Sequence, residues 1–433
     1  MACFLLVAET LIFLFGFLYL FKRDIFFGVY YFFLFVYGFF AQVGYFYKKE
    51  LSAVLGAYFG EDAWYPATEL IILSLAAVWF LFMFFRQKFL KMIPIALVVK
   101  SRRINFLGWF AITFVFYVLL FEVVYLLINF DNISWYTAQD ETFVAQNPLF
   151  GVFIFVFKLM VAINLALYCV IRSNAGIFSK SFMKSLLAIS LLIFMFIAFR
   201  LGNRTDVIGL SLGAAVYEFY QIRFTWKIVL KVTAVSAVLL LFLSTIESLR
   251  YTDGKVDSDL LTSILLKDYY APAHMLFAAV HFSYVDPLEV LSSNFKNALI
   301  LFKYPYLQYA VSELFRPGLT TRSSSYAFYL FTEGYLVMGM FGFIYNAFIV
   351  MTGLSLWRRL AMSNSKTFNL FLLGLMGCML INLVRGQSSY FIKYLYTFVL
   401  PGVLFYLPLA GQKISVVIGR QANLQFRFPQ GDP

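Results

Sequence analysis

The sequence predicts an α-helical membrane protein that crosses the bilayer many times. Of its 433 residues, 62% are hydrophobic and only 13% are charged, and a soluble fold of this length could not bury so much apolar surface. Apolar runs of about 20 residues recur along the chain, which is the length that a helix needs to cross hydrocarbon. The runs are too long and too uniformly apolar for the alternating strands of a membrane barrel. Since lipid cannot hydrogen-bond the backbone, a bundle of helices remains.

We predict about eleven spans, all within a single integral-membrane domain over residues 1–433. The sequence leaves open whether a short re-entrant segment lies near Met92–Val99. In chain order the predicted spans are Cys3–Phe21, Ile25–Tyr47, Ala67–Phe85, Ile104–Phe130, Leu149–Ile171, Leu186–Phe199, Val207–Ile222, Ile228–Ile246, Tyr326–Trp357, Phe368–Val384 and Tyr390–Ala410.

The charges of the connections predict the orientation of these spans. Lysine and arginine gather in every second connection, and cytoplasmic loops of membrane proteins carry such an excess. The N-terminus is therefore expected outside, and the C-terminus, with a tail over residues 411–433, in the cytoplasm. The same bias accounts for most of the net charge of +12, without nucleic acid as a partner. The basic connections contain Lys22 and Arg23, Arg86 to Arg103, Arg172 to Lys184, Arg223 and Lys227, Arg358 to Lys366, and the tail.

One large outer insertion, residues 247–325, lies between the eighth and ninth predicted spans. Two amphipathic stretches within it, about Leu260–Tyr284 and Pro287–Phe302, place apolar side chains at helical spacing. We expect helices that lie on the bilayer surface or across the mouth of the bundle.

Six arginines on the outer side break the charge rule and suggest a binding site for an anion. Guanidinium groups bind phosphate oxygens in pairs of charge-assisted hydrogen bonds. A lipid-linked phosphate or pyrophosphate is the anion most readily found at an outer membrane face. The alternative is that each arginine pairs with a nearby acid or a lipid headgroup. The six are Arg200, Arg204, Arg250, Arg316, Arg322 and Arg385.

The outer side also carries candidates for a general base. His274 and His281 lie seven residues apart, so a helix would place them on one face. Glu333, Glu313 and Asp268 are competing bases, and a carboxylate such as Glu333 within a span is costly unless paired. The sequence has only two histidines, which excludes a His-rich metal centre. The three cysteines lie inside apolar runs, which favours packing roles for them. Neither a nucleotide-binding loop nor an Asp-rich metal motif is visible, so we expect neither a metal nor another cofactor.

Four polar residues within or beside the spans have structural interpretations. Lys158 and Glu122 could form a buried ion pair, which we favour, or face the cavity of the bundle. Glu218 is expected to partner a nearby polar group, and Asp206 could orient Arg204.

The second half of the chain, from about Phe199 to Leu400, resembles the Wzy-type bacterial polysaccharide polymerases. The order of several short motifs around the long outer insertion carries this resemblance. They are Gly202-Asn203-Arg204, Leu249-Arg250-Tyr251, Lys267-Asp268-Tyr269-Tyr270-Ala271-Pro272, Phe315-Arg316-Pro317-Gly318, Glu333-Gly334-Tyr335 and Val384-Arg385-Gly386.

The resemblance implies a glycosyltransferase of the bacterial inner membrane with a GT-C-like helical bundle. Such enzymes join polyprenyl-pyrophosphate-linked oligosaccharide units at the periplasmic face, so lipid-linked donor and acceptor are the expected partners, and binding of a chain-length regulator stays open. Arg204, Arg250 and Arg385 match the family's outer arginines. We assign Arg204 and Arg385 to the pyrophosphate and treat Arg200, Arg250, Arg316 and Arg322 as auxiliary. His274 is the first candidate for the base and Glu333 the second.

Three other functions fit the same hydropathy. An O-antigen ligase would transfer the same donor to lipid A-core. A flippase or other transporter would more often carry charged residues in several spans and an internal pseudo-symmetry. A non-enzymatic assembly subunit is opposed only by the cluster of arginines.

Overall fold

The computed structural model describes residues 2–44, 60–92, 95–101, 105–130, 147–174, 176–201, 203–221, 271–299, 307, 311 and 328–418. Their contacts divide into two compact units, which are taken one at a time below. Unit 1 comprises Met1–Leu90, Val256–Ser355 and Leu380–Lys393, and unit 2 comprises Lys91–Lys255, Leu356–Met379 and Tyr394–Pro433.

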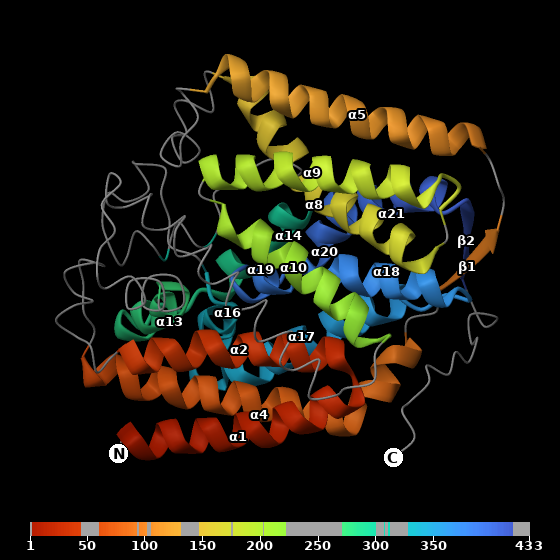
Figure 1. Ribbon diagram of the computed structural model, residues 1–433. Coiled ribbons are helices and arrows are strands. Elements are labelled where there is room, and N and C mark those ends of the chain that lie inside the picture. Colours follow the sequence, from red (N-terminus) through yellow and green to blue (C-terminus); the bar gives the residue numbers. More distant parts are fainter. Residues whose placement is uncertain are drawn as a thin grey trace. The chain divides into compact units, whose positions relative to one another are not determined.

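Unit 1 is arranged around helix α2 (Ile25–Gly44), which packs against α1, α13 and α19 (Figure 1). Tyrosine hydroxyls tie this helix to its neighbours through backbone carbonyls. Tyr31 donates to Leu75 O at 3.2 Å, and Tyr329 donates to Leu34 O at 2.9 Å. Buried phenols need such partners, so these bonds hold otherwise apolar helices in register. The other elements are α1 (Ala2–Arg23), α4 (Glu61–Met92), α13 (Ala271–His281), α14 (Pro287–Leu299), α16 (Leu330–Met338), a 3₁₀ turn at Gly339–Phe341, α17 (Gly342–Leu360), α19 (Leu380–Val384) and α20 (Tyr390–Tyr394).

Helix α8 (Pro148–Ser173) is the centre of unit 2. It packs against the five helices α5 (Asn105–Ile128), α9 (Lys180–Leu201), α10 (Arg204–Phe219), α18 (Lys366–Gly377) and α21 (Leu400–Leu409). Cys169 on α8 and Cys378 after α18 are buried free thiols, as expected of packing residues. A Cβ at Gly213 of α10 would stand 2.3 Å from Cys378 Sγ, so glycine is what lets α10 approach α18 this closely.

Unit 2 also contains a two-stranded antiparallel sheet, which corrects the all-α prediction. Strand β1 (Ile95–Ser101) pairs with β2 (Gln412–Ile418) in a register that joins Ile95 to Ile418 and Ser101 to Gln412. The Asn364 side chain extends it by accepting from Val99 N at 2.6 Å and donating to Val99 O at 2.9 Å. Pairing of the two strands supplies hydrogen bonds to backbone N–H and C=O groups of segments that lie beyond helix ends. Three connections predicted on the cytoplasmic side therefore contact one another.

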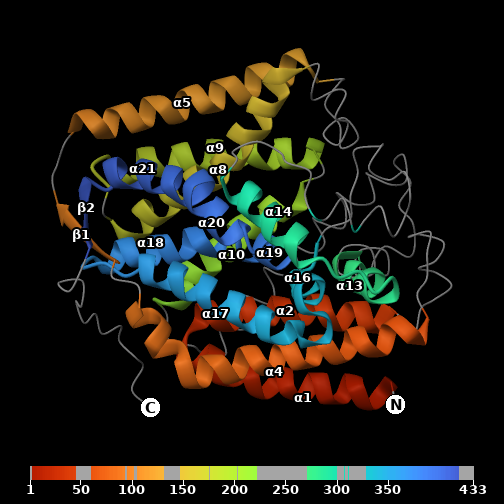
Figure 2. The ribbon, with the colours of Figure 1, turned by 180° about the vertical axis from the view of Figure 1, so that it is seen from behind.

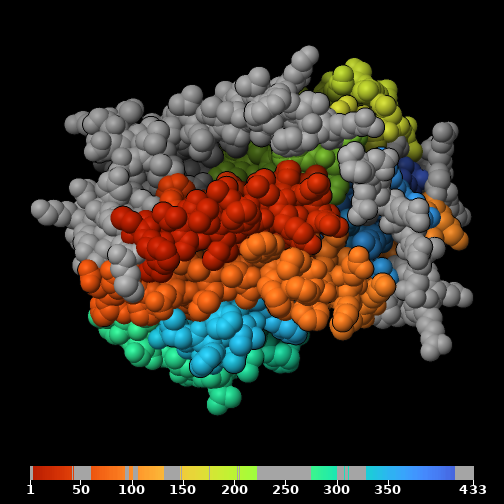
Figure 3. Space-filling view, turned by 90° about the horizontal axis from the view of Figure 1, so that it is seen from below, coloured from red at the N-terminus to blue at the C-terminus, as the bar shows by residue number. Residues whose placement is uncertain are grey.

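The described helices agree with the predicted spans in position. Within the described ranges, seven helices are long and apolar enough to cross a membrane, and the shorter apolar helix Ile25–Phe40 adds to them. The span predicted at Ile228–Ile246 lies outside the described residues. Figure 3 looks onto a face of unit 1 formed by α1 and α4, and α1 exposes Phe4, Phe15 and Leu18 to the surroundings. Such a surface suits lipid, so the chain is a polytopic helical membrane protein.

Three of the predicted spans are interrupted helices. Tyr326–Trp357 corresponds to α16 and α17, which meet at Gly339 with a φ of +58°. Phe368–Val384 divides into α18 and α19. Tyr390–Ala410 contains a π-helical turn over Leu395–Val399 between α20 and α21. Interrupted helices within membrane proteins are tolerated where other polar groups satisfy the freed backbone, which makes the first break a candidate site.

Candidate functional site

Glu333 of α16 is fully buried at 0% exposure, and its carboxylate accepts four hydrogen bonds. Asn294 Nδ2 of α14 donates at 2.7 Å and the Tyr345 hydroxyl of α17 at 2.5 Å. Ser388 donates twice, from its backbone N at 2.7 Å and from its Oγ at 2.6 Å. A carboxylate within an apolar bundle is stable only with such compensation. Glu333 therefore joins α14, α16, α17 and the connection after α19.

A second group of polar side chains continues this network within unit 1. Asn297 Nδ2 donates to Ser389 Oγ at 2.7 Å and to Gln387 Oε1 at 3.3 Å. Lys393 of α20 donates from Nζ to Asn297 Oδ1 at 2.9 Å. The connection between α19 and α20 is called the outer link below and consists of Arg385-Gly386-Gln387-Ser388-Ser389. Hydrogen bonds at its last three residues thus fix it in place.

Two glycines allow the backbones at this network to approach closely. A Cβ at Gly386 would lie 2.0 Å from the Tyr390 ring and 2.8 Å from Asn382 O. A Cβ at Gly334 would lie 2.3 Å from Asn346 Oδ1, and this oxygen accepts from Gly334 N at 3.1 Å. The glycines next to Glu333 and Arg385 therefore have a packing reason.

Helix α14, which packs against α16 (Figure 2), buries Ser293 and Asn297 and exposes several large apolar side chains. Ser293 and Asn297 are 7% and 1% exposed. Leu288 and Phe295 are 79% and 68% exposed, and Leu291 and Leu299 are exposed as well. A soluble protein would have the opposite arrangement. The exposed apolar side chains of α14 suit contact with lipid, and its buried Ser293 and Asn297 lie toward the polar network.

Three polar atoms at this site are buried and have no hydrogen-bond partner among the described residues. They are Ser293 Oγ, Asn294 Oδ1 and Gln387 Nε2. Unsatisfied buried donors and acceptors are costly, about 1–3 kcal/mol each, so a ligand that supplies their partners would bind with a gain. Neutral donors and acceptors suit a ligand with hydroxyl groups, and the nearby Lys393 ammonium suits a ligand with negative charge.

Among the predicted catalytic residues, Glu333, Arg385 and His274 belong to unit 1 and Arg204 belongs to unit 2. Glu333 contacts the outer link that contains Arg385, whose backbone N donates to Ile381 O at 3.0 Å. Arg204 begins α10 in unit 2. Arg250, Arg316 and Arg322 lie outside the described residues, as do Glu313 and Asp268.

Arg200 contacts the segment that follows α5 rather than a nearby acid. Its Nη2 donates to Phe130 O at 2.8 Å, and its guanidinium lies 4.4 Å from the centre of the Phe130 ring. Both contacts are made just after the end of α5, where a cation is favoured by exposed carbonyls. These contacts engage one side of the guanidinium, and Arg200 Nε is buried without a hydrogen-bond partner among the described residues.

The two histidines belong to one helix, as their spacing predicted. His274 and His281 lie in the first and last turns of α13. His281 Nδ1 lies 2.9 Å from Asp62 Oδ2, and both side chains are exposed. This contact links α13 to the beginning of α4 and joins two segments predicted on the outer side.

Among the polar residues within spans, one predicted pairing is confirmed and one is wrong. Glu218 accepts from Arg172 Nε at 2.8 Å and from the Tyr168 hydroxyl at 2.7 Å, so it is a structural partner. Glu122 is fully buried, but within the described residues neither of its carboxylate oxygens has a hydrogen-bond partner. Lys158 instead acts electrostatically on Asp206. Helical spacing alone could not tell which sides of α5 and α8 face each other.

Asp206 has a local explanation. Its backbone N donates to Asn203 Oδ1 at 3.3 Å, and its Oδ2 accepts from Asn203 Nδ2 at 2.7 Å. Asn203 is the residue before the first turn of α10, so this reciprocal pair caps the helix. The Gly202-Asn203-Arg204 motif therefore contains a helix start.

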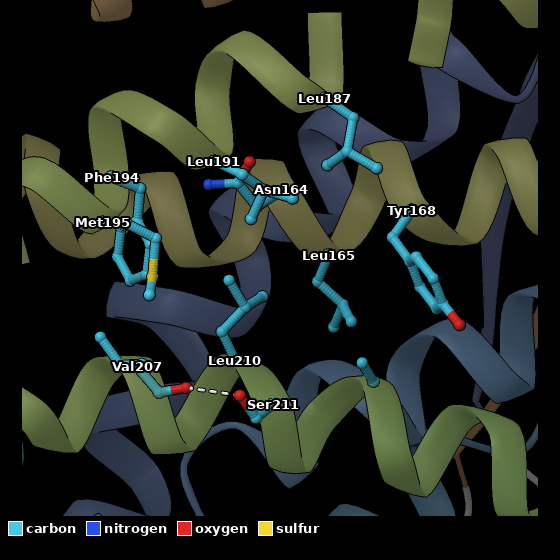
Figure 4. Close-up of a pocket in the computed structure, with 11 residues that line it drawn as sticks. Asn164, Leu165, Tyr168, Leu187, Leu191, Phe194, Met195, Val207, Leu210 and Ser211 are labelled. Carbon is cyan, nitrogen blue, oxygen red and sulfur yellow. Dashed lines mark hydrogen bonds between the residues drawn. The ribbon is translucent and has the colours of Figure 1, made fainter. Parts of the chain in front are cut away.

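Unit 2 contains an apolar cavity of about 220 Å³ between α8, α9 and α10. Figure 4 shows Leu187, Phe194 and Leu210 around it, with the Asn164 amide among them. Asn164 is buried, and neither amide atom has a partner within the described residues. The lining suits a hydrocarbon chain rather than a glycan.

Sequence reasoning found Glu333 and Arg385 but missed the residues that hold them. Ser388, Asn294, Asn297, Tyr345 and Lys393 each make a contact described above. The available signal was the spacing of Ser293, Asn294 and Asn297, which places three small polar side chains on one side of an apolar helix. No protein-family model matches the chain, and no curated protein or solved structure is similar enough to count as a match.

Proposed function

We propose that this membrane protein is a glycosyltransferase that joins polyprenyl-pyrophosphate-linked oligosaccharide units at the periplasmic face of the inner membrane. One observation carries the proposal. The buried Glu333 carboxylate holds Ser388 through two hydrogen bonds, and this fixes the outer link with Arg385 beside the inward polar side of α14. A lipid-linked glycan needs such a polar site separated from lipid by an amphipathic element.

The chemistry assigned to this site is displacement at the sugar carbon that bears the pyrophosphate. The bond from that carbon to the pyrophosphate oxygen breaks, and a bond to the acceptor hydroxyl oxygen forms. Arg385 would stabilise the negative charge on the leaving pyrophosphate, the role that the sequence also predicts for Arg204. The hydroxyl proton passes to a base, for which His274 stays the first candidate. Because Glu333 already accepts four hydrogen bonds, we assign it to positioning the outer link.

The sorting of contacts supports the proposed orientation. Asp62, His281, Asn294 and Ser388 come from segments predicted outside; Asp62 contacts His281, and Asn294 and Ser388 both donate to Glu333. The strands β1 and β2 and Asn364 come from segments predicted inside. A site at the outer link would then face the periplasm, where lipid-linked oligosaccharides are polymerised.

The test is synthesis of polymer from purified lipid-pyrophosphate-linked oligosaccharide by the full chain in nanodiscs. Arg385→Ala and Arg204→Ala are each expected to lower kcat/KM by about 100-fold or more, as for loss of a charge-stabilising donor. Arg385→Lys should recover little, because lysine lacks the two-pronged geometry. Arg359→Ala, at the predicted inner end of α17, is the matched control and should keep its activity. Wild-type activity in Arg385→Ala would contradict the proposal.

A cell experiment distinguishes a polymerase from an O-antigen ligase, which uses the same donor. A deletion strain that makes single repeat units only, and regains a ladder with the wild-type gene, supports a polymerase. Long lipid-linked chains that are not attached to lipid A-core would favour a ligase.

A transporter of lipid-linked glycans is the second candidate, and one observation favours it. Glu9 of α1 and Glu122 of α5 are buried acids within candidate spans, and among the described residues neither has a hydrogen-bond partner. Intramembrane acids of this kind occur on ion and proton pathways. Flipping of fluorescent lipid-linked oligosaccharide in proteoliposomes, without polymer formation, would select this function.

A further inference from the structure

Three buried polar side chains of unit 1 have unsatisfied polar atoms and lie outside the hydrogen bonds made by Glu333. They are Glu9 of α1, Gln42 of α2 and Thr68 of α4, and each is 0% exposed. Both carboxylate oxygens of Glu9, both amide atoms of Gln42 and the Thr68 hydroxyl lack a hydrogen-bond partner. Five unsatisfied buried atoms at one site would be costly without a ligand.

Contacts between the helices place Glu9 and Gln42 beside one stretch of α4, and helical spacing puts Thr68 on that stretch. Trp64 Nε1 donates to Gln42 O at 3.3 Å. A Cβ at Gly38 would lie 2.8 Å from Ile71 Cγ2 and 3.3 Å from Glu9 Oε1. Thr68 lies one turn after Trp64 and one turn before Ile71, so it occupies the same side of α4 between these two contacts. The Gln42 amide also faces the Glu9 carboxyl, although outside hydrogen-bond geometry.

The charge of the site is that of one carboxyl group. The titratable groups that face Glu9 from the other elements are the phenols of Tyr31 and Tyr329, which are neutral at pH 7. Over the described ranges, no lysine, arginine or histidine is among the groups that act on Glu9. A single buried carboxylate needs one positive charge, and a divalent ion would leave an excess of charge in an apolar bundle.

We propose that Glu9, Gln42 and Thr68 bind an alkali cation, Na⁺ or K⁺, inside the bundle. The available ligands are the two Glu9 oxygens, Gln42 Oε1 and Thr68 Oγ1, and hard cations prefer oxygen ligands of this kind. The Gln42 amide nitrogen cannot bind a cation and would turn away from it. This site goes beyond the proposed transferase activity and does not depend on it, since its test measures binding and stability.

The experiment compares thermal unfolding of the purified full chain in sodium, potassium and choline chloride at equal ionic strength. Choline is too large for a site between three packed helices. For the wild type we expect the alkali salts to raise Tm by about 2 °C or more over choline. In Glu9→Gln this rise should disappear. Thr68→Val removes one ligand with little change of shape, and it should need several-fold more salt for half of the effect.

Glu122→Gln is the matched control, because it removes another buried carboxyl without hydrogen-bond partners from a different helix. It should keep the full response to sodium or potassium. An equal response in wild type and Glu9→Gln would overturn the site, and so would equal Tm values in the three salts for the wild type. A third outcome is that the Tm of the wild type depends on pH but not on sodium or potassium, and that the Tm of Glu9→Gln depends on neither. This outcome would overturn the cation site and assign a proton to Glu9 instead. If Glu9→Gln does not fold, the Thr68→Val titration decides.

Discussion

Unit 1 contains two buried glutamates that are alike in burial and opposite in bonding. Glu333 and Glu9 are both 0% exposed. Glu333 accepts four hydrogen bonds from three elements, whereas Glu9 accepts none within the described residues. The first carboxylate is compensated by the fold, so its removal leaves donors without an acceptor. The second is not, so its removal takes away a cost. Burial alone therefore does not tell a structural acid from a binding acid.

The strongest test of this comparison is Glu333→Leu. Four donors would lose their acceptor, and we expect a loss of about 3–5 kcal/mol in the free energy of unfolding. Glu333→Gln keeps one acceptor oxygen and should lose less. Denaturation of the purified protein in mixed micelles measures both, with the exposed Glu69→Gln as control. If the Leu variant were as stable as the control, the four-bond description would be wrong.

The activity of Glu333→Gln tests positioning against catalysis by the same residue. If Glu333 positions the outer link, kcat falls and the pH at which the rate is half-maximal stays at its wild-type value. If Glu333 is the base, the acid limb of the pH–rate profile moves or disappears. Rate measurements across pH on the folded variant separate these outcomes.

Asn297→Ala tests the second group of the same network at a smaller scale. Lys393, Ser389 and Gln387 each lose a hydrogen bond to Asn297, and we expect a loss of about 1–3 kcal/mol. The exposed Ser292→Ala, on the same helix, should change stability by less than about 0.5 kcal/mol. Equal unfolding midpoints for the two variants would show that the contacts of Asn297 contribute nothing.

Glu9→Gln should have the opposite sign from the Glu333 variants. In choline chloride it removes an uncompensated carboxyl, so Tm should equal or exceed that of wild type. Glu122→Gln should behave in the same way, because its carboxyl also has no described hydrogen-bond partner. A Tm well below wild type in choline for Glu9→Gln would mean that Glu9 is bonded much as Glu333 is.

A spectroscopic test addresses the orientation of α14 and involves little change in stability. A nitroxide at position 291 should collide more often with oxygen than with a water-soluble nickel complex, because Leu291 faces outward into lipid. The background variant is Cys3→Ser, since Cys169 and Cys378 are buried. The exposed position 62, at the beginning of α4, serves as the water-facing control. Preference for nickel at position 291 would contradict a lipid-facing α14.

Hydropathy and charge sufficed to predict where most described helices lie, because the cost of a polar group in lipid is local to each residue. They also predicted that Glu333 would need a partner within its span. They did not predict the strands at Ile95–Ser101 and Gln412–Ile418, because β1 and β2 lie more than 300 residues apart in the sequence, and neither is stable alone.

The sequence by itself determined the solvent of this protein, since 62% hydrophobic residues in runs of spanning length leave only helices in lipid. It also determined which residues would be expensive there, Glu122 and Glu333 among them. Only the tertiary structure decided which of these acids is compensated. Hydrogen bonds between side chains depend on distances of a few ångströms between helices that are remote in the chain, and helical periodicity gives a side of each helix but not its neighbour.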